Sequence, residues 1–334
     1  MNSYQRVFNR LAGNEVDHVP NLSIIMTFAA SYIGVPYKKY ITDYRYLVEG
    51  NIECCDEFGI DMVSVISDPC REGADMGAEI RMPEDDVPSF KGILLENYSD
   101  LSKIKIIDPL EGPRMLDRIK GVELFNDKVG KKYPILGWVE GPFASAGNLR
   151  GINNLMTDLY EKPDFVHELL EICTEQATQF ARHQVNAGAD FMGIGDAAAS
   201  LIGPEHYKKF VLPYERKLIQ SIQKTGAKTK LHICGNISSF LHLIPRTGVD
   251  VVDIDWMLDF SKSVKTLKSK SSACGNFDPV EILLRGSTEK VRNSVKKCLD
   301  AGIKDTFISP GCEVPKNTPQ ENMYEITRTL KKYS

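Results

Sequence analysis

The sequence has no long hydrophobic run and no block of charge of a single sign. No uncharged apolar stretch is long enough to span a bilayer, and charged residues from Arg6 to Asp17 occupy the place where a secretory signal would be apolar. The 334 residues carry a formal net charge of −4, with acidic and basic residues interspersed. These features predict a cytoplasmic protein and give no reason to expect a nucleic acid or a membrane as a partner.

The sequence shows no sign of a disulfide framework, and the common nucleotide-binding motifs are absent. The chain has eight cysteines, and without a secretory signal they are better interpreted as thiols or metal ligands than as a disulfide framework. Cys54, Cys55, Cys173 and Cys298 fall in stretches with a helical pattern, where small buried residues are expected. The lack of a GxGxxG motif and of a Walker loop argues against a nucleotide-binding sheet.

Short β-rich runs alternate with longer amphipathic stretches along the whole chain. The runs predicted as strands are 19–26, 62–67, 133–141, 191–197, 228–235, 251–256, 272–277 and 306–310. Predicted helices between them include 164–187, 204–225 and 288–301. Pro163 suits a first helical turn, and Gly188 suits a C-terminal cap.

Eight strand–helix alternations predict an α/β fold, namely a (β/α)8 TIM barrel that forms a single domain over residues 1–334. The residues before the first strand form an N-terminal extension. The long interval after the second strand predicts an insertion, around 79–98. A doubly wound open sheet is the alternative architecture.

The strongest local signal is a His-x-Cys pair in the segment LHICGN, at the end of a predicted strand. Side chains alternate along a strand, so His232 and Cys234 point the same way and can approach one ion. On spacing alone, a core histidine beside a core cysteine is the more common interpretation, because a His-x-Cys pair is only moderately specific.

A third candidate ligand, Cys312, follows Gly311 at the end of the last predicted strand. A closed barrel brings its strand ends together around one axis, so distance along the chain is no obstacle. One nitrogen and two sulfurs are a soft ligand set suited to Zn²⁺. Three protein ligands leave a tetrahedral position open, which is typical of catalytic zinc.

The segments HICGN, GNFDP and SPGCEVPKNTP carry a resemblance to a known family. The chain resembles the uroporphyrinogen decarboxylase-like superfamily and, more narrowly, its zinc-dependent methyltransferases that act with corrinoid proteins. That branch includes the methyltransferase I of O-demethylase systems and the coenzyme M methyltransferases. The resemblance runs from LAGNEVDHVP to TPQEN. It implies zinc held by His232, Cys234 and Cys312, and cobalamin (a corrinoid) carried by a partner protein.

Some members of that branch add a carboxylate ligand from the next strand end. The residue at that place is Asp255, where the family carries glutamate, and Asp253 lies on the same face of the strand. An acidic strand end can also cap a helix or pair with a lysine.

Further candidates lie at the predicted barrel mouth. Glu140, Asp196 and Asp255 are the candidate catalytic carboxylates. The candidates for substrate binding are Asn21, Met26, Trp138, Tyr214 and Asn276. Gly193 and Gly195 would let a ligand approach the backbone. The alternative for each polar candidate is a helix cap or a loop hydrogen bond, and for each apolar one it is barrel packing.

The resemblance implies transfer of a methyl group, in one of two directions. In the favoured direction, a small methyl ether (an aryl methyl ether) is demethylated and its methyl group passes to the Co(I) of a partner corrinoid protein. The alternative is a methylcobalamin:thiol methyltransferase of the coenzyme M type. Zinc would act as a Lewis acid in either case.

Two other functions compete with methyl transfer. One is a zinc-bearing binding module without turnover. The other is uroporphyrinogen decarboxylation, in which family members grip the substrate carboxylates with an arginine-rich loop near the N-terminus. The corresponding residues here, 23–30, contain no arginine, which argues against that activity.

Overall fold

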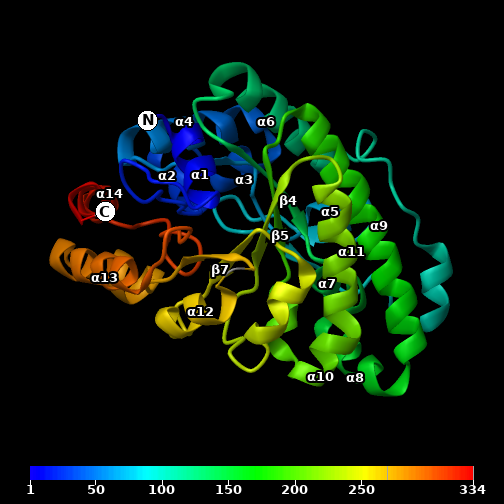
Figure 1. The fold of residues 1–334 in the computed structure, drawn as a ribbon. Helices are drawn as coiled ribbons and strands as arrows, with labels where there is room; N and C mark the ends of the chain where they lie inside the picture. The colour runs from blue at the N-terminus through cyan, green and yellow to red at the C-terminus, as the bar shows by residue number, and fades with distance from the viewer. Residues whose placement is uncertain (269, 334) are drawn as a thin grey trace.

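The computed structural model describes residues 1–268 and 270–333, and helices alternate with strands throughout (Figure 1). The strands are β1 (Val63–Ser64), β2 (Ile80–Arg81), β3 (Ser89–Phe90), β4 (Ile135–Glu140), β5 (Phe191–Gly195), β6 (Lys228–His232), β7 (Val251–Ile254) and β8 (Ser272–Gly275). The α-helices are α1 (Ser3–Leu11), α2 (Thr27–Tyr32), α3 (Tyr37–Thr42), α4 (Tyr44–Phe58), α5 (Arg71–Asp75), α6 (Pro113–Val129), α7 (Pro142–Arg150), α8 (Ile152–Glu161), α9 (Pro163–Ala187), α10 (Pro204–His206), α11 (Leu212–Gln223), α12 (Phe260–Leu267), α13 (Thr288–Ala301) and α14 (Gln320–Tyr333). The 3₁₀ and π segments are η1 (Tyr98–Lys103), η2 (Ala197–Leu201), η3 (Tyr207–Val211), η4 (Leu241–Thr247) and η5 (Pro279–Leu284).

Six strands form one parallel sheet in the order β1-β4-β5-β6-β7-β8. The strands lie at the centre of the molecule, with α9 and α11 outside them (Figure 1). The register aligns Glu140, Gly195, His232 and Asp253 in one row across β4 to β7. Because parallel strands share one carboxyl edge, the loops that follow these strands lie at the same end of the sheet.

Two of the eight predicted strands are isolated bridges instead of full strands. Asn21, in segment 19–26, forms a parallel bridge with Ile308, and Phe307, in segment 306–310, forms one with β8. Each segment contains a proline, which cannot donate a ladder hydrogen bond. The α/β class and the parallel, barrel-like order are therefore confirmed, but the parallel sheet itself has six strands.

The predicted helices 164–187 and 288–301 correspond to α9 and α13, and Gly188 caps α9 with a φ of +119°. The predicted helix over 204–225 is confirmed as one uninterrupted helical run to Gln223, but its winding changes, because the π segment η3 lies between α10 and α11. Pro213, at the start of α11, has no N–H to donate back to the preceding turn. This missing hydrogen bond accounts for the change in winding.

The interval after β1 holds the predicted excursion. Residues 79–98 contain the antiparallel hairpin β2–β3, in which Ile80 faces Phe90, and η1 follows. At the N-terminus, α1 is tied to the body of the protein through Arg6, whose Nη1 lies 2.5 Å from Oδ1 of the buried Asp61.

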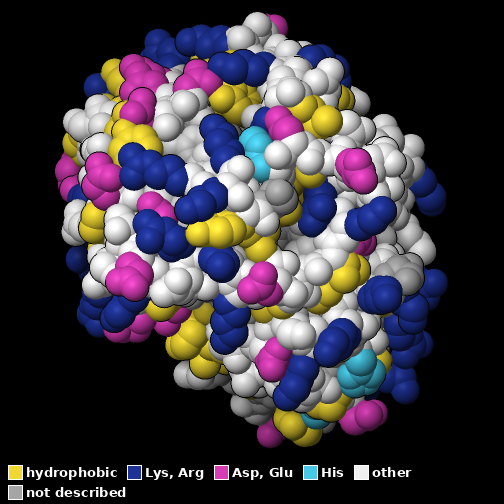
Figure 2. Space-filling model, turned by 60° about the vertical axis from the view of Figure 1, so that its left-hand side comes forward, with side chains coloured by type: hydrophobic (Ala, Val, Ile, Leu, Met, Phe, Trp, Pro, Cys, Tyr) yellow, Lys and Arg dark blue, Asp and Glu magenta, His cyan; other side chains and the backbone are white. Residues whose placement is uncertain are grey.

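The surface shows mixed charge. Figure 2 shows Lys and Arg side chains interspersed with Asp and Glu over the face in view, with small separate apolar areas between them. Within residues 1–268 and 270–333, no helix combines the length and the apolarity needed to cross a membrane.

Candidate metal centre

Three potential metal ligands from two distant parts of the chain lie together at the carboxyl end of the sheet. His232 is the last residue of β6, Cys234 follows two positions later, and Cys312 comes just after the 306–310 segment. Nε2 of His232 lies 2.8 Å from Sγ of Cys234 and 3.8 Å from Sγ of Cys312. The two sulfur atoms are 3.7 Å apart. The predicted convergence of one imidazole and two thiols is thus present in the structure.

These spacings suit a tetrahedral zinc ion. Typical zinc bond lengths place two thiolates about 3.8 Å apart, and a nitrogen and a sulfur about 3.6 Å apart. Two of the three observed separations, 3.7 and 3.8 Å, match those values, while the third is shorter by less than an ångström. Among the described residues, these are the three His, Cys, Asp or Glu side chains grouped closely enough to hold an ion.

Exposure sets the two predicted ligand thiols apart from the other cysteines. All eight cysteines are free thiols. Cys234 and Cys312 are partly exposed, whereas the remaining six are buried. Hydrogen bonding from Cys234, helped by His232, lowers the pKa of Cys312 to about 4 against the effect of burial. The same contact with Cys312, together with burial, raises the pKa of Cys234. Without a metal, the trio therefore favours one thiolate, on Cys312.

Asp253 supports the imidazole from its other ring nitrogen. Oδ2 of Asp253 lies 3.3 Å from Nδ1 of His232 and also accepts a hydrogen bond from Nζ of the buried Lys230. Burial lowers the pKa of His232, but the charges and hydrogen bonds of Cys234 and Asp253 outweigh burial and raise it. A carboxylate behind a histidine orients the ring and strengthens it as a ligand.

The fourth candidate ligand, Asp255, lies outside this group. Its Oδ2 accepts from the backbone N–H of Gly235 at 2.9 Å, and its Oδ1 accepts from the N–H of Met257 at 2.9 Å. Both oxygens are therefore committed to shaping the loops after β6 and β7. The aspartate is also one methylene shorter than the glutamate of the family pattern. We assign Asp255 to loop structure and retain neither its ligand role nor its catalytic role.

A small cavity opens beside the three ligands, with a volume of about 160 Å³. Its lining residues are Ile24, Met26, Ile66, Asp68, Pro69, Trp138, Glu140, Gly195, Ala197, His232, Cys234, Cys312 and Glu313. Three of the predicted residues, Met26, Trp138 and Glu140, are therefore in place at the candidate site. The cavity is walled by apolar side chains and by carboxyl groups.

The chain matches one family model over nearly its full length, from residue 2 to residue 333, and that model describes uroporphyrinogen decarboxylase (URO-D). The chain belongs to the uroporphyrinogen decarboxylase family. The chain is also similar to methyltransferases. It is 34% identical over 248 residues to the methylcobamide:CoM methyltransferase MtbA of Methanosarcina mazei, which covers 74% of this chain and 72% of MtbA.

Two further similar proteins are named for the two different activities. A solved methyltransferase structure from Methanosarcina mazei superposes with a TM-score of 0.92 at 25% identity, covering 100% of this chain and 99% of that one. The uroporphyrinogen decarboxylase of Carboxydothermus hydrogenoformans is 26% identical over 296 residues, covering 86% of this chain and 83% of the decarboxylase. The recognised family is confirmed, and its methyltransferase branch fits the similarity to MtbA.

Sequence reasoning missed a buried ionic cluster behind the cavity wall of this family member. Arg71 Nη2 lies 3.1 Å from Oε1 of Glu140, and Arg114 Nη2 lies 2.6 Å from Oδ2 of Asp68. Glu72 accepts a hydrogen bond from the backbone N–H of Glu140 at 2.8 Å. Asp68 directly follows the predicted strand 62–67. This position at a strand end could have marked it as a candidate site residue.

The two glycines of β5 make room for the side chain of Trp138. A Cβ added at Gly193 would lie 2.1 Å from Cε3 of Trp138, and one at Gly195 would lie 3.1 Å from its Cζ2. The indole therefore packs over the β5 backbone and forms part of the cavity wall. Gly195 also lines the cavity, so the approach of a ligand to the backbone stays a prediction there, whereas the indole fills the space at Gly193.

Four other predicted residues do not line this cavity. Their polar groups form hydrogen bonds with other parts of the protein. Asp196 is fully buried and accepts from the backbone N–H of Ala144 at 2.6 Å, at the start of α7. Asn276 donates to the carbonyls of Asp255 and Leu258. The other two are Asn21, bonded to Ser23, and Tyr214, whose hydroxyl lies 2.8 Å from Nδ1 of His167.

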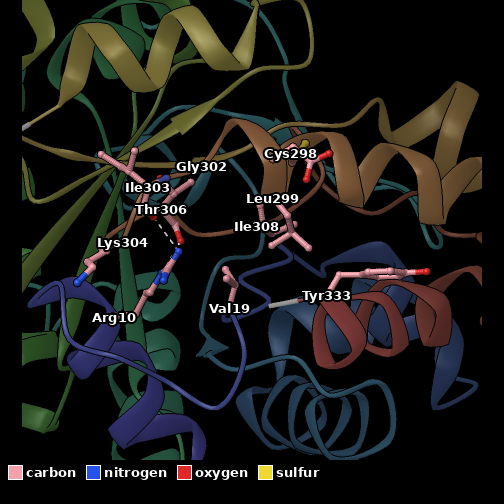
Figure 3. A pocket seen from close by; sticks show the side chains of 11 residues that line it. Arg10, Val19, Cys298, Leu299, Gly302, Ile303, Lys304, Thr306, Ile308 and Tyr333 are labelled. Carbon is pink, nitrogen blue, oxygen red and sulfur yellow. Dashed lines mark hydrogen bonds between the residues drawn. The ribbon is translucent and has the colours of Figure 1, made fainter.

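A second and larger cavity, of about 410 Å³, lies before the 306–310 segment, at the end opposite Cys312 (Figure 3). Arg10 points into this region, and its guanidinium donates to the carbonyls of Ile303 and Thr306. These bonds hold the turn that leads into the segment. At this end of parallel strands, such contacts stabilise the fold.

Proposed function

We propose that the chain is a zinc-dependent methyltransferase that moves a methyl group from the corrinoid of a partner protein to a small thiol. The observation that carries the proposal is the convergence of His232, Cys234 and Cys312 beside a cavity at the carboxyl edge of the sheet. The similarity to a methylcobamide:CoM methyltransferase supports the same chemistry.

The chain's own residues would bind the metal and position the acceptor. His232, Cys234 and Cys312 would hold zinc, and Asp253 would keep the imidazole in place. Zinc, when bound, supplies a Lewis acid whose open position favours the deprotonated form of a thiol. In the overall reaction, the sulfur–carbon bond forms while the cobalt–carbon bond breaks. The electron pair of the broken bond stays on cobalt, which becomes Co(I), and the thiol proton is released.

The comparisons favour the thiol direction over the methyl-ether direction that sequence analysis preferred. The methyltransferase relative MtbA is named for methylcobamide and coenzyme M, and no comparison supports an aryl methyl ether substrate. An ether assay remains a useful second arm, because the same ligand set could polarise an ether oxygen.

Decarboxylation of a porphyrinogen fits the cavity poorly. Segment 23–30 has no arginine, and no lysine or arginine is found among the described residues that line the cavity. A substrate with many carboxylates would instead meet Asp68, Glu140 and Glu313. Like charges in a confined site repel, so we place this activity below methyl transfer.

The test combines a metal assay with a spectral assay. Purified protein should contain about one zinc per chain. It should convert methylcobalamin to Co(I) in the presence of a small thiol, under anaerobic conditions, with formation of the methyl thioether. Cys234→Ala and Cys312→Ala should lose the zinc and the activity. The buried Cys298→Ala, which is outside the trio, should keep both.

Full zinc occupancy in Cys312→Ala would show that the ligands are misassigned. Zinc with no thiol methylation, together with methyl transfer from guaiacol to Co(I), would reverse the direction of the proposed reaction. Zinc without turnover in either arm would favour the binding module.

A further inference from the structure

The cavity beside the three ligands contains carboxyl groups but no cationic side chain. Asp68, Glu140 and Glu313 line it, and its other described lining residues are apolar or belong to the ligand trio. Arg71 and Arg114 lie behind Glu140 and Asp68 and are not part of the lining. The polar end of any ligand that reaches the metal would therefore meet carboxyl oxygens.

The three carboxyl groups differ in the hydrogen bonds that they already accept within the protein. Asp68 accepts with Oδ1 from the N–H of Cys70 and with Oδ2 from Ser67 and Arg114. Oε1 of Glu313 accepts two hydrogen bonds from Thr27, and no donor from residues 1–268 or 270–333 reaches its Oε2.

Glu140 is anchored by an arginine instead of a threonine. Arg71 holds its Oε1 at 3.1 Å, while no donor from residues 1–268 or 270–333 reaches Oε2, and the side chain is 9% exposed. Oε2 is thus a fixed acceptor with access to the cavity.

Glu140 and the metal ligands are well placed to bind the two ends of one small molecule. Glu140 and His232 lie in the same registered row, separated by Gly195. Two strand spacings put their backbones about 10 Å apart, and both side chains enter the cavity between them. The indole of Trp138 covers Gly195 and offers an apolar surface to a carbon chain. The volume of about 160 Å³ corresponds to roughly five water volumes.

We propose that this cavity binds a small aminothiol, with its sulfur at the metal and its ammonium group donating to Oε2 of Glu140. The inference rests on the proposed function and specifies its acceptor. It separates this chain from a methyltransferase whose acceptor ends in a sulfonate, such as coenzyme M.

The electrostatics of the wall disfavour an anion. Burial and the charges of Glu72 and Asp68 raise the pKa of Glu140 to about 8, even though Arg71 opposes the shift. The surroundings that make one negative charge costly on Glu140 would also oppose a sulfonate beside it. A bound ammonium group would lower the pKa of Glu140 again, so that the ionised carboxylate accepts a charge-assisted hydrogen bond from it.

The test compares acceptors that share a two-carbon chain and differ in their head group: cysteamine, 2-mercaptoethanol and 2-mercaptoethanesulfonate. For the zinc-loaded protein with methylcobalamin, kcat/KM should be about tenfold or more higher for cysteamine than for the sulfonate, with the alcohol between them. Affinities of the corresponding S-methyl products, measured by calorimetry, should follow the same order and do not depend on turnover.

Glu140→Gln separates the head-group effect from differences in thiol reactivity. The variant should reduce the preference for cysteamine over the sulfonate by about tenfold, while 2-mercaptoethanol changes little. Glu215→Gln is the matched control, because Glu215 is an equally buried carboxyl outside the cavity lining and should leave the ratio unchanged.

A wild-type preference for the sulfonate in both assays would overturn this inference and leave the proposed function intact. An unchanged head-group ratio in folded, zinc-loaded Glu140→Gln would overturn it as well. If no thiol is methylated at all, the proposed function fails first. The wild-type ranking remains decisive if the glutamine variant does not fold.

Discussion

At the scale of single residues, the side chains behind the ligands determine how firmly the metal is held. Asp253 links two buried groups, because its Oδ2 contacts both His232 and Lys230. Lys230 is 1% exposed, so its ammonium depends on this carboxylate for compensation. Asp253 therefore contributes to two properties, zinc affinity and folding stability, which different variants can separate.

Asp253→Asn should weaken zinc binding by about 10–100-fold, because the imidazole loses its orienting carboxylate. It should also lower the free energy of unfolding by about 3–5 kcal/mol, because a buried ammonium is left unpaired. The double variant Lys230→Met/Asp253→Asn should recover most of the stability but not the zinc affinity. Chelator competition and urea denaturation measure the two effects, and unchanged zinc affinity in both variants would contradict the role given to Asp253.

Glu140 provides a pH-dependent prediction. Burial raises its pKa from the ordinary 4.5 to about 8 in the folded protein. The folded state then keeps a proton that the unfolded chain loses, so this group stabilises the fold fully below pH 4.5 and progressively less up to pH 8. Glu140→Gln should therefore show a shallower fall in unfolding free energy than wild type across that window, by urea titration at several pH values. Parallel curves for the two proteins would contradict the raised pKa.

Residue-level prediction from sequence succeeded where chemistry and periodicity agreed. His232 ends a strand, Cys234 follows two positions later, and Cys312 follows the last extended segment, so their convergence follows from the barrel topology. Arg71 could not be found in this way, because its burial depends on pairing with Glu140 across a separation of 69 positions. A contact between residues so far apart does not produce a periodic pattern in the sequence.

At the scale of elements, the strand ends hold both the candidate site and the helix caps, and residue type alone does not separate the two roles. Asp196 directly follows β5 and accepts hydrogen bonds from the first turn of α7. Burial raises its pKa to about 7, although these backbone N–H groups oppose the shift. We therefore interpret Asp196 as a capping residue.

Two substitutions distinguish capping from catalysis at this position. Asp196→Asn keeps an acceptor for the N–H of Ala144 and should leave zinc content and methyl transfer close to wild type. Asp196→Ala removes the acceptor and should lower the free energy of unfolding by roughly 1–2 kcal/mol. Denaturation curves and turnover are compared side by side. Loss of activity in a stable, zinc-loaded Asp196→Asn would restore the catalytic interpretation.

Helices were predicted well where sequence signals marked both ends. Pro163 and Gly188 define α9, and Ser287 caps α13 through the N–H of Lys290. The stretch 204–225 has a helical pattern but contains Pro213, whose effect on winding depends on the local packing. Similarly, an apolar run such as 19–26 predicts an extended segment but does not reveal how many ladder bonds it forms.

For the molecule as a whole, the candidate metal centre joins the end of β6 to the residues that follow the last extended segment. His232 and Cys312 are 80 positions apart, so a bound ion connects parts of the barrel that are otherwise linked through several strands. A ligand that binds the folded state alone stabilises that state by mass action.

Removal of zinc should therefore lower the melting temperature. At free zinc about a thousandfold above its dissociation constant, the metal contributes about 4 kcal/mol to the free energy of unfolding. Calorimetry with and without a chelator should show this difference in wild type and in Cys298→Ala, and none in Cys312→Ala. A melting temperature that does not respond to chelation of the wild-type protein would argue against a bound metal.

The most direct test of the account is zinc K-edge X-ray absorption on the purified protein, with and without a small thiol. The account predicts two sulfur ligands and one imidazole, with a light exchangeable ligand in the fourth place, and a rise to three sulfurs when cysteamine is added. Four protein ligands that do not change on adding the thiol, or a protein without zinc, would contradict it.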